Sequence, residues 1–197
     1  MRNTILILQK FAFILYCLLP QFLNASNAVN PELRSHFSQM WVDSVKIQPD
    51  THAAFRGILF LQQPTEIDLQ LSGSSWYVLW LNGEYFFEGP DRYHPAHPEY
   101  QVKRVSLPAG KHNLAVQVHY EGVDTRMLKD IQPFLMVRAV NQVKQIIPID
   151  WKCSYLPGYD SQFRRISAQL GWVEWADSRL IPDGWQKPGY NLSLIHI

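Results

Sequence analysis

This sequence has few cysteines and almost no excess of positive or negative charge. The 197 residues include two cysteines, Cys17 and Cys153, and 18 lysine and arginine residues against 17 aspartate and glutamate residues. A net charge of +1 gives no electrostatic reason to expect a nucleic-acid partner. Recognition of any partner must therefore depend on aromatic and neutral polar side chains.

Helical periodicity is also missing from residue 55 onward, where apolar residues recur with a period close to two. Residues 65–71 alternate cleanly between apolar and polar side chains, and residues 76–81 and 84–88 flank the dipeptide Asn82-Gly83. Both residues of that dipeptide tolerate the positive φ that a two-residue hairpin turn requires. An apolar run covers residues 55–61, residues 112–120 also alternate between apolar and polar side chains, and further runs lie at 100–107 and 134–140. This pattern predicts about seven strands in an all-β sandwich with one core.

The first 28 residues have the features of a secretory signal peptide. Arg2 and Lys10 provide the positive region, an apolar stretch covers residues 11–23, and small residues precede the expected cleavage site after Ala28. Pro20 interrupts the stretch, which is too short for a membrane-spanning helix of about 20 residues. We expect export to the periplasm or the extracellular space, with no membrane association after cleavage.

Removal of that segment would leave Cys153 as the single thiol of the mature chain. One cysteine cannot form an internal disulfide, so the fold must rest on packing. The surrounding residues match no nucleophile motif, and we expect a small, buried and inert side chain. A catalytic thiol is the alternative.

Three motifs resemble the N-terminal sandwich domains of bacterial α-L-rhamnosidase-like glycoside hydrolases. They are the string 77–83 that ends in Asn-Gly, the Gly-Pro-x-Arg loop at 89–92, and the Gly-x-x-Asn turn that opens the strand after Gly110. The aromatic-rich stretch 171–190 adds to this resemblance. It implies a jelly-roll, galactose-binding-domain-like sandwich that precedes a catalytic α/α-toroid.

Three further parts are expected after the signal peptide at residues 1–28. Residues 29–145 are expected to form the accessory sandwich, and residues 146–191 an irregular aromatic-rich linker or the start of the next segment. The last six residues, 192–197, match the translated end sequence of a transposon used to prepare sequencing libraries. We expect them to be a sequencing scar and the chain to be a fragment, whose main partner is the missing catalytic domain.

No catalytic residue can be assigned, because the family's acid and base carboxylates belong to that catalytic domain. An inverting glycosidase needs two carboxyl groups about 6.5–9.5 Å apart. The acidic side chains near the hairpin, Glu84, Glu88, Asp91 and Glu99, are more simply interpreted as solvated. Whether the full-length protein is an enzyme stays open at this point, but this chain is expected to lack a complete active site.

A sugar-binding surface needs an aromatic platform surrounded by planar hydrogen-bonding groups. Four residues of the right types converge on the hairpin and the loop after it, and they are Trp80, Arg92, Tyr93 and His94. Alternating aromatics in strands are normally core, and we assign Tyr85 or Phe86 to the core. The alternative for this surface is that it packs on the catalytic toroid.

Neither a metal nor a cofactor is expected. His94 and His97 are three residues apart, a spacing at which two histidines can bind the same metal ion. Pro95 lies between them and favours an extended backbone that separates the two rings. A second aromatic set, Trp172, Trp175 and Trp185, is expected to await a missing partner domain and to leave apolar surface exposed.

The resulting hypothesis is a non-catalytic accessory β-sandwich of a secreted α-L-rhamnosidase-like glycoside hydrolase that acts on polysaccharides. The alternatives are a freestanding carbohydrate-binding module that contacts an oligosaccharide or polysaccharide, and a structural cell-surface sandwich.

Overall fold

The computed structural model describes residues 39–42, 47–91, 99–125, 129, 131–161 and 164–191, and these residues contain β-strands and no helix. The main strands are β1 (Thr51–Leu61), β2 (Thr65–Ser74), β3 (Trp76–Leu81), β4 (Glu84–Gly89), β5 (Gln101–Leu107), β6 (Gly110–Tyr120), β7 (Phe134–Asn141), β8 (Ile146–Ile147) and β9 (Ile149–Tyr155). A small hairpin follows, with strands β10 (Arg165–Ser167) and β11 (Gly171–Trp172). The predicted all-β class is confirmed, with more strands than expected.

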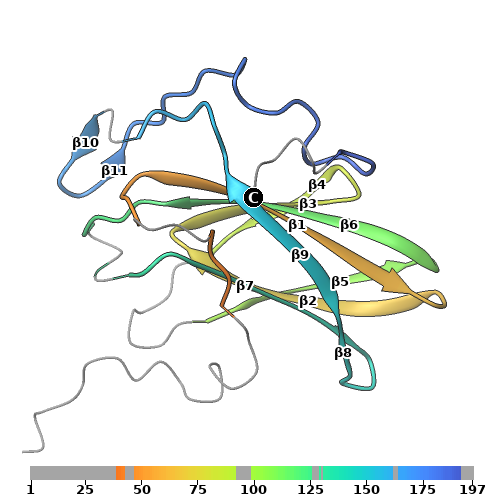
Figure 1. Cartoon of the computed structure of the whole chain (residues 1–197). Coiled ribbons are helices and arrows are strands. Elements are labelled where there is room, and N and C mark those ends of the chain that lie inside the picture. The colour runs from red at the N-terminus through yellow and green to blue at the C-terminus, as the bar shows by residue number, and fades with distance from the viewer. Residues whose placement is uncertain are drawn as a thin grey trace, which may run out of the picture.

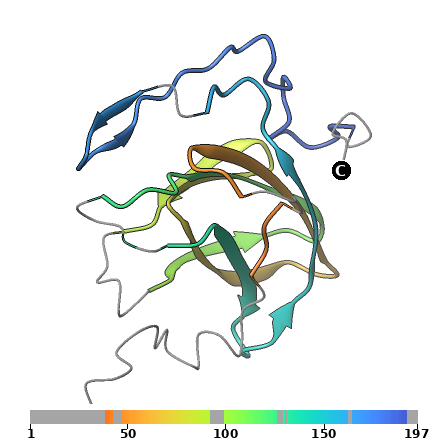
Figure 2. The same ribbon diagram turned by 60° about the vertical axis from the view of Figure 1, so that its left-hand side comes forward.

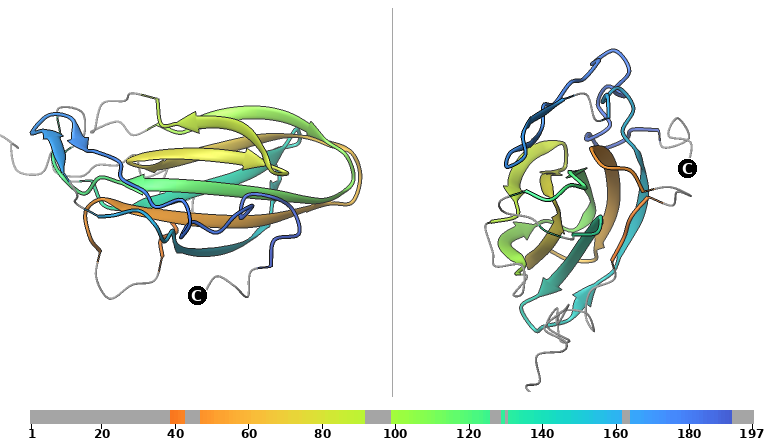
Figure 3. Two further views of the ribbon diagram at one scale, coloured as in Figure 1. Left: turned by 90° about the horizontal axis from the view of Figure 1, so that it is seen from above. Right: turned by 90° about the vertical axis from the view of Figure 1, so that its left-hand side faces the viewer.

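Two antiparallel sheets face each other in a sandwich. The five-stranded sheet has the order β4-β3-β6-β1-β9, and the four-stranded sheet has the order β5-β2-β7-β8. Figure 1 shows the two sheets as stacked layers, and Figure 2 shows the C-terminal segment outside the five-stranded one. The end-on view of Figure 3 shows the same segment arching over that sheet.

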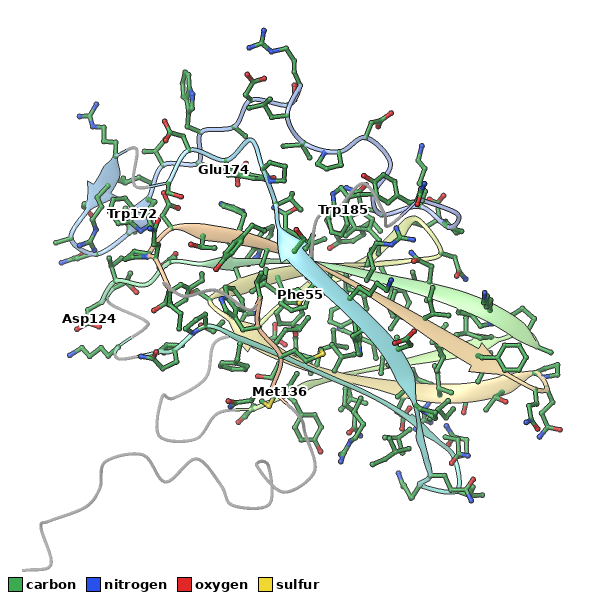
Figure 4. The ribbon with its side chains drawn as sticks, viewed as in Figure 1. Phe55, Asp124, Met136, Trp172, Glu174 and Trp185 are labelled. Atoms are coloured by element: carbon green, nitrogen blue, oxygen red, sulfur yellow. The ribbon has the colours of Figure 1, made fainter. Side chains whose placement is uncertain are left out.

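The core lies between the two sheets and is built from alternate residues of the strands. Phe55 on β1, Leu79 on β3 and Val116 on β6 are fully buried there, together with Leu69 from the opposite sheet. Figure 4 places Phe55 in this layer. The period of two therefore determined which side chains of these strands face inward.

The hairpin predicted at Asn82-Gly83 is confirmed. The strands β3 and β4 pair across the turn, and the two turn residues have φ angles of 54° and 90°. Of the aromatics on β4, Phe87 is buried, Phe86 packs against the core and Tyr85 is 60% exposed. The prediction that Tyr85 or Phe86 belongs to the core is thus confirmed for Phe86. Phe87, which the prediction did not include, is also a core residue.

The sandwich continues past the predicted boundary at residue 145. Strand β9 pairs with β1 along seven register positions, from Ala53 opposite Tyr155 to Leu59 opposite Ile149. Gly57 of β1 makes this pairing possible, because a Cβ there would lie 2.6–2.9 Å from the side chains of Ile149 and Trp151. Sequence patterning missed β9 because its side chains are only partly buried.

No helix in the described part of the chain is long and apolar enough to span a membrane. The predicted signal peptide, residues 1–28, and the predicted scar, residues 192–197, lie outside the described residues.

Candidate functional site

Residues 156–161 and 164–191, which we call the strap, cover much of the outer face of the five-stranded sheet (Figure 1). The outward-facing positions 52, 54 and 56 of β1 and 113, 115 and 117 of β6 are accordingly buried, although several are polar. The buried polar side chains of this face are His52, Arg56, Asn113 and Gln117. This part of the outer face is therefore a second packing interface of the fold.

Trp185 is the anchor of the strap. Its side chain is 1% exposed and packs with Ala54, Ala115 and Leu156 in a second apolar cluster. The Trp80 ring meets it edge to face, with 5.7 Å between ring centroids. Figure 4 shows Trp185 between the strap and the sheet. The expectation that Trp185 awaits another domain is wrong, because the chain's own sheet supplies its partners.

Two polar side chains of the sheet hold the strap backbone beside Trp185. Arg56 donates hydrogen bonds to the carbonyl oxygens of Trp185 and Lys187, the latter at 3.0 Å, and Asn113 donates to that of Gln186 at 2.8 Å. The Arg56 guanidinium also lies 5.5 Å from the centre of the Tyr190 ring. Burial lowers the pKa of the Arg56 guanidinium, as expected for a charge taken out of water. These contacts, which we call the clamp, fix the path of residues 185–190.

Three rings stack at the other end of the covered face. His52 on β1 and His119 on β6 are register partners, with ring centroids 4.1 Å apart and an interplanar angle of 7°. Tyr159 of the strap stacks on the opposite face of His52 at 3.8 Å. The strap thus contacts the sheet through a ring stack at one end and through the clamp at the other.

Gln117 connects the members of this stack. Its amide nitrogen lies 3.2 Å from Nδ1 of His52 and donates to the Tyr159 hydroxyl at 2.9 Å. Burial and, to a smaller extent, the neighbouring His119 lower the pKa of His52 to about 3, against an opposing effect of Asp50. His52 is therefore neutral near pH 7, and Nδ1 accepts the amide proton.

Asp50, His52 and His119 offer three ligand atoms within 4.8 Å of one another, a spacing close enough for a metal site. An imidazole binds a metal ion through a lone pair in its own ring plane. The two rings are nearly parallel and stacked, so one ion cannot lie in both planes. Asp50 instead accepts a hydrogen bond from Nε2 of His119 at 2.9 Å. As placed, the three groups form a hydrogen-bonded stack and not a chelating set.

The β10–β11 hairpin of the strap docks on Glu121, just after β6. Trp172 donates from its indole nitrogen to the Glu121 carbonyl oxygen at 2.9 Å, and Arg165 lies over the Trp172 ring. A Cβ on Gly171 would lie 3.0 Å from the Glu121 carboxylate, and Gly171 has a φ of 73°. Burial raises the pKa of the Glu121 carboxyl. Trp172 therefore also makes contacts within this chain, contrary to the expectation that it awaits another domain. Trp175 is 57% exposed.

The predicted sugar-contacting residues are only partly described. Trp80 lies on β3 and is partly covered by Trp185, as above. Arg92, Tyr93 and His94, and with them His97, lie outside the described residues. Sugar binding at this hairpin therefore stays a prediction.

The remaining candidates for chemistry are separated from the stack. Glu84, Glu88, Asp91 and Glu99 are all exposed, which agrees with their interpretation as solvated carboxylates. Cys153 is partly buried against the sandwich core, and its thiol lies 3.7 Å from the carbonyl oxygen of Trp41.

Sequence reasoning missed His52, Gln117 and Tyr159 as a group. The alternation along β6 did place Gln117 and His119 on one face. Only the pairing of β1 with β6 and the return of the strap bring the three rings together.

Comparison with known proteins finds likeness to solved structures, two of which are α-L-rhamnosidases. No protein-family model and no curated protein matches the chain. The GH78 family rhamnosidase of Bacillus sp. GL1 matches 81% of this chain with a TM-score of 0.74 and 22% sequence identity. The α-L-rhamnosidase from Dictyoglumus thermophilum matches 74% with a TM-score of 0.51 and 20% identity.

The likeness is one of fold, and it covers a small part of those enzymes. The chain spans 18% of the first enzyme's length and 17% of the second's. The matched 81% is more than the sandwich from Thr51 to Tyr155, so the likeness also includes part of the flanking segments. The resemblance that the hairpin and loop motifs indicated is thereby confirmed at the level of the fold.

Proposed function

We propose that this chain is a non-catalytic accessory β-sandwich of an exported α-L-rhamnosidase-like glycoside hydrolase that acts on polysaccharides. The observation that carries the proposal is the fold likeness to a GH78 rhamnosidase, with a TM-score of 0.74 over 81% of the chain. That likeness covers more residues than the sandwich strands alone. Fold alone supplies no chemistry, and the activity is assigned to a part of the protein outside this chain.

The strap supports a role in domain positioning. The clamp fixes residues 185–190 against a rigid sheet, so a following segment would leave the sandwich from a defined place. The strap also presents large apolar side chains to solvent, namely Ile166, Leu170, Trp175 and Leu180, which are 57–64% exposed. Exposed apolar groups concentrated in one segment are typical of an interaction surface. We assign this surface to contact with the catalytic domain.

The decisive experiment is to recover the uninterrupted gene by long-read sequencing and to assay its product. We expect the reading frame to continue past Tyr190 into a helical domain. The full protein should hydrolyse p-nitrophenyl α-L-rhamnopyranoside, whereas the present chain alone should not. A stop codon near Asn191, or a downstream domain without glycosidase activity, would reject the hydrolase assignment.

A second candidate is a freestanding carbohydrate-binding module, favoured by the aromatic and polar side chains on the molecule's surface. It predicts sugar binding by the isolated chain and no requirement for a downstream domain. Sequencing past Tyr190 separates the two candidates.

A further inference from the structure

A groove lies at the far end of the sandwich, away from the ring stack. It has a volume of about 790 Å³ and lies between the β1–β2 turn and the segment that joins β7 to β9. Its lining includes Phe60, Gln62, Gln63, Pro148 and Asp150. All of these side chains belong to the part of the chain that the structure describes.

Phe60 is the distinctive residue of this groove. Its neighbours along β1, Leu59 and Leu61, point into the sandwich core, whereas Phe60 points outward and is 61% exposed. The strap buries the outward positions His52, Ala54 and Arg56 of the same strand. Phe60 lies beyond that cover, so most of its ring is available to a ligand.

The polar lining suits a hydroxylated ligand. Asp150 on β9 is the register partner of Ile58, so its carboxylate is on the outer face next to the Phe60 position. Gln62 and Gln63 are exposed in the turn that follows β1. A pyranose offers one apolar face to an aromatic ring, while carboxylate and amide groups accept and donate hydrogen bonds with its hydroxyls.

We propose that this groove binds a pyranose unit, with the sugar's apolar face on the Phe60 ring and its hydroxyls toward Asp150 and Gln62. The volume falls in the range of small-molecule sites, about 300–1,000 Å³. A protein partner fits less well, because the groove surrounds one aromatic ring with exposed carboxamide and carboxylate groups. The site is separate from the predicted one at Trp80 and does not depend on the proposed hydrolase function.

The test is a titration of the mature chain, isotopically labelled for NMR, with the methyl glycosides of L-rhamnose, D-galactose and D-glucose. At least one sugar should give saturable shifts at the amides of Phe60, Gln62 and Asp150. Phe60→Ala should weaken that binding tenfold or more without lowering the melting temperature greatly, since the ring is mostly exposed. Tyr85→Ala is the matched control, because Tyr85 is 60% exposed on the β3–β4 hairpin and does not line the groove, and this variant should bind as the wild type does.

Several results would overturn the proposal. They are the absence of saturable shifts with all three sugars, unchanged binding in Phe60→Ala, or shifts that map to the Trp80 hairpin instead. Normal sugar binding by Phe60→Ala together with weakened contact to a downstream domain would make the groove a domain interface. None of these outcomes bears on the continuation of the reading frame, so failure here is distinguishable from failure of the proposed function.

Discussion

Acidification should destabilise this fold through His52. The side chain is 5% exposed, and burial with the neighbouring His119 lowers its pKa from 6.5 to about 3. When folding lowers the pKa of a histidine, the folded state keeps its full stability at a pH above the pKa of the unfolded chain, here 6.5. That stability is lost progressively as the pH falls from 6.5 toward 3, because only the unfolded chain binds the proton in this range.

The loss at pH 5 follows from the distance between pH 5 and the unfolded pKa. It amounts to about 1.5 pH units at about 1.4 kcal/mol each, or about 2 kcal/mol. Glu121 acts in the opposite direction, because burial raises its pKa and acidification relieves the cost of its charge. Asp50 and Tyr159 also face the stack, so a variant at position 52 is needed to isolate the histidine.

The assay is urea unfolding at pH 7.5 and pH 5, followed by tryptophan fluorescence, for the wild type and His52→Gln. The variant should lose stability at pH 7.5 through the broken stack, yet its further loss on acidification should be smaller than that of the wild type by about 2 kcal/mol. Ser154→Ala is the control, because it lies on the same sheet face and removes no ionisable group. An equal pH dependence in wild type and His52→Gln would refute the reasoning.

Three further predictions concern the strap and the N-terminus. Trp185→Ala should cost about 3–5 kcal/mol in urea unfolding, because it empties the second apolar cluster, and a cost below about 1 kcal/mol would contradict the buried position. Arg56→Met should cost about 2–3 kcal/mol and speed limited proteolysis between Asp183 and Tyr190, since the carbonyls of Trp185 and Lys187 lose a charged donor. Unchanged proteolysis would argue against the clamp. Mass spectrometry of the exported protein should find Val29 as the first residue, and an intact N-terminus would contradict signal-peptide cleavage.

The sequence determined the strands with strong local signals. Asn82-Gly83 set the hairpin because both positions require positive φ, and the alternation along 65–71 and 112–120 set which side chains face the core. The sequence also carried the family resemblance, since its motifs coincide with turns and strand starts. These features are local, so they are readable without knowledge of what packs against them.

Only the tertiary structure decided what covers the outer face. The same alternation that placed Leu114 in the core placed Gln117 toward solvent, yet Gln117 is buried because Tyr159 returns over it. Trp185, expected to await another domain, fills a cluster on the chain's own sheet, while Phe60, in an apolar run, stays exposed. A period of two identifies the two faces of a strand, but which face is covered depends on contacts between residues far apart in the chain.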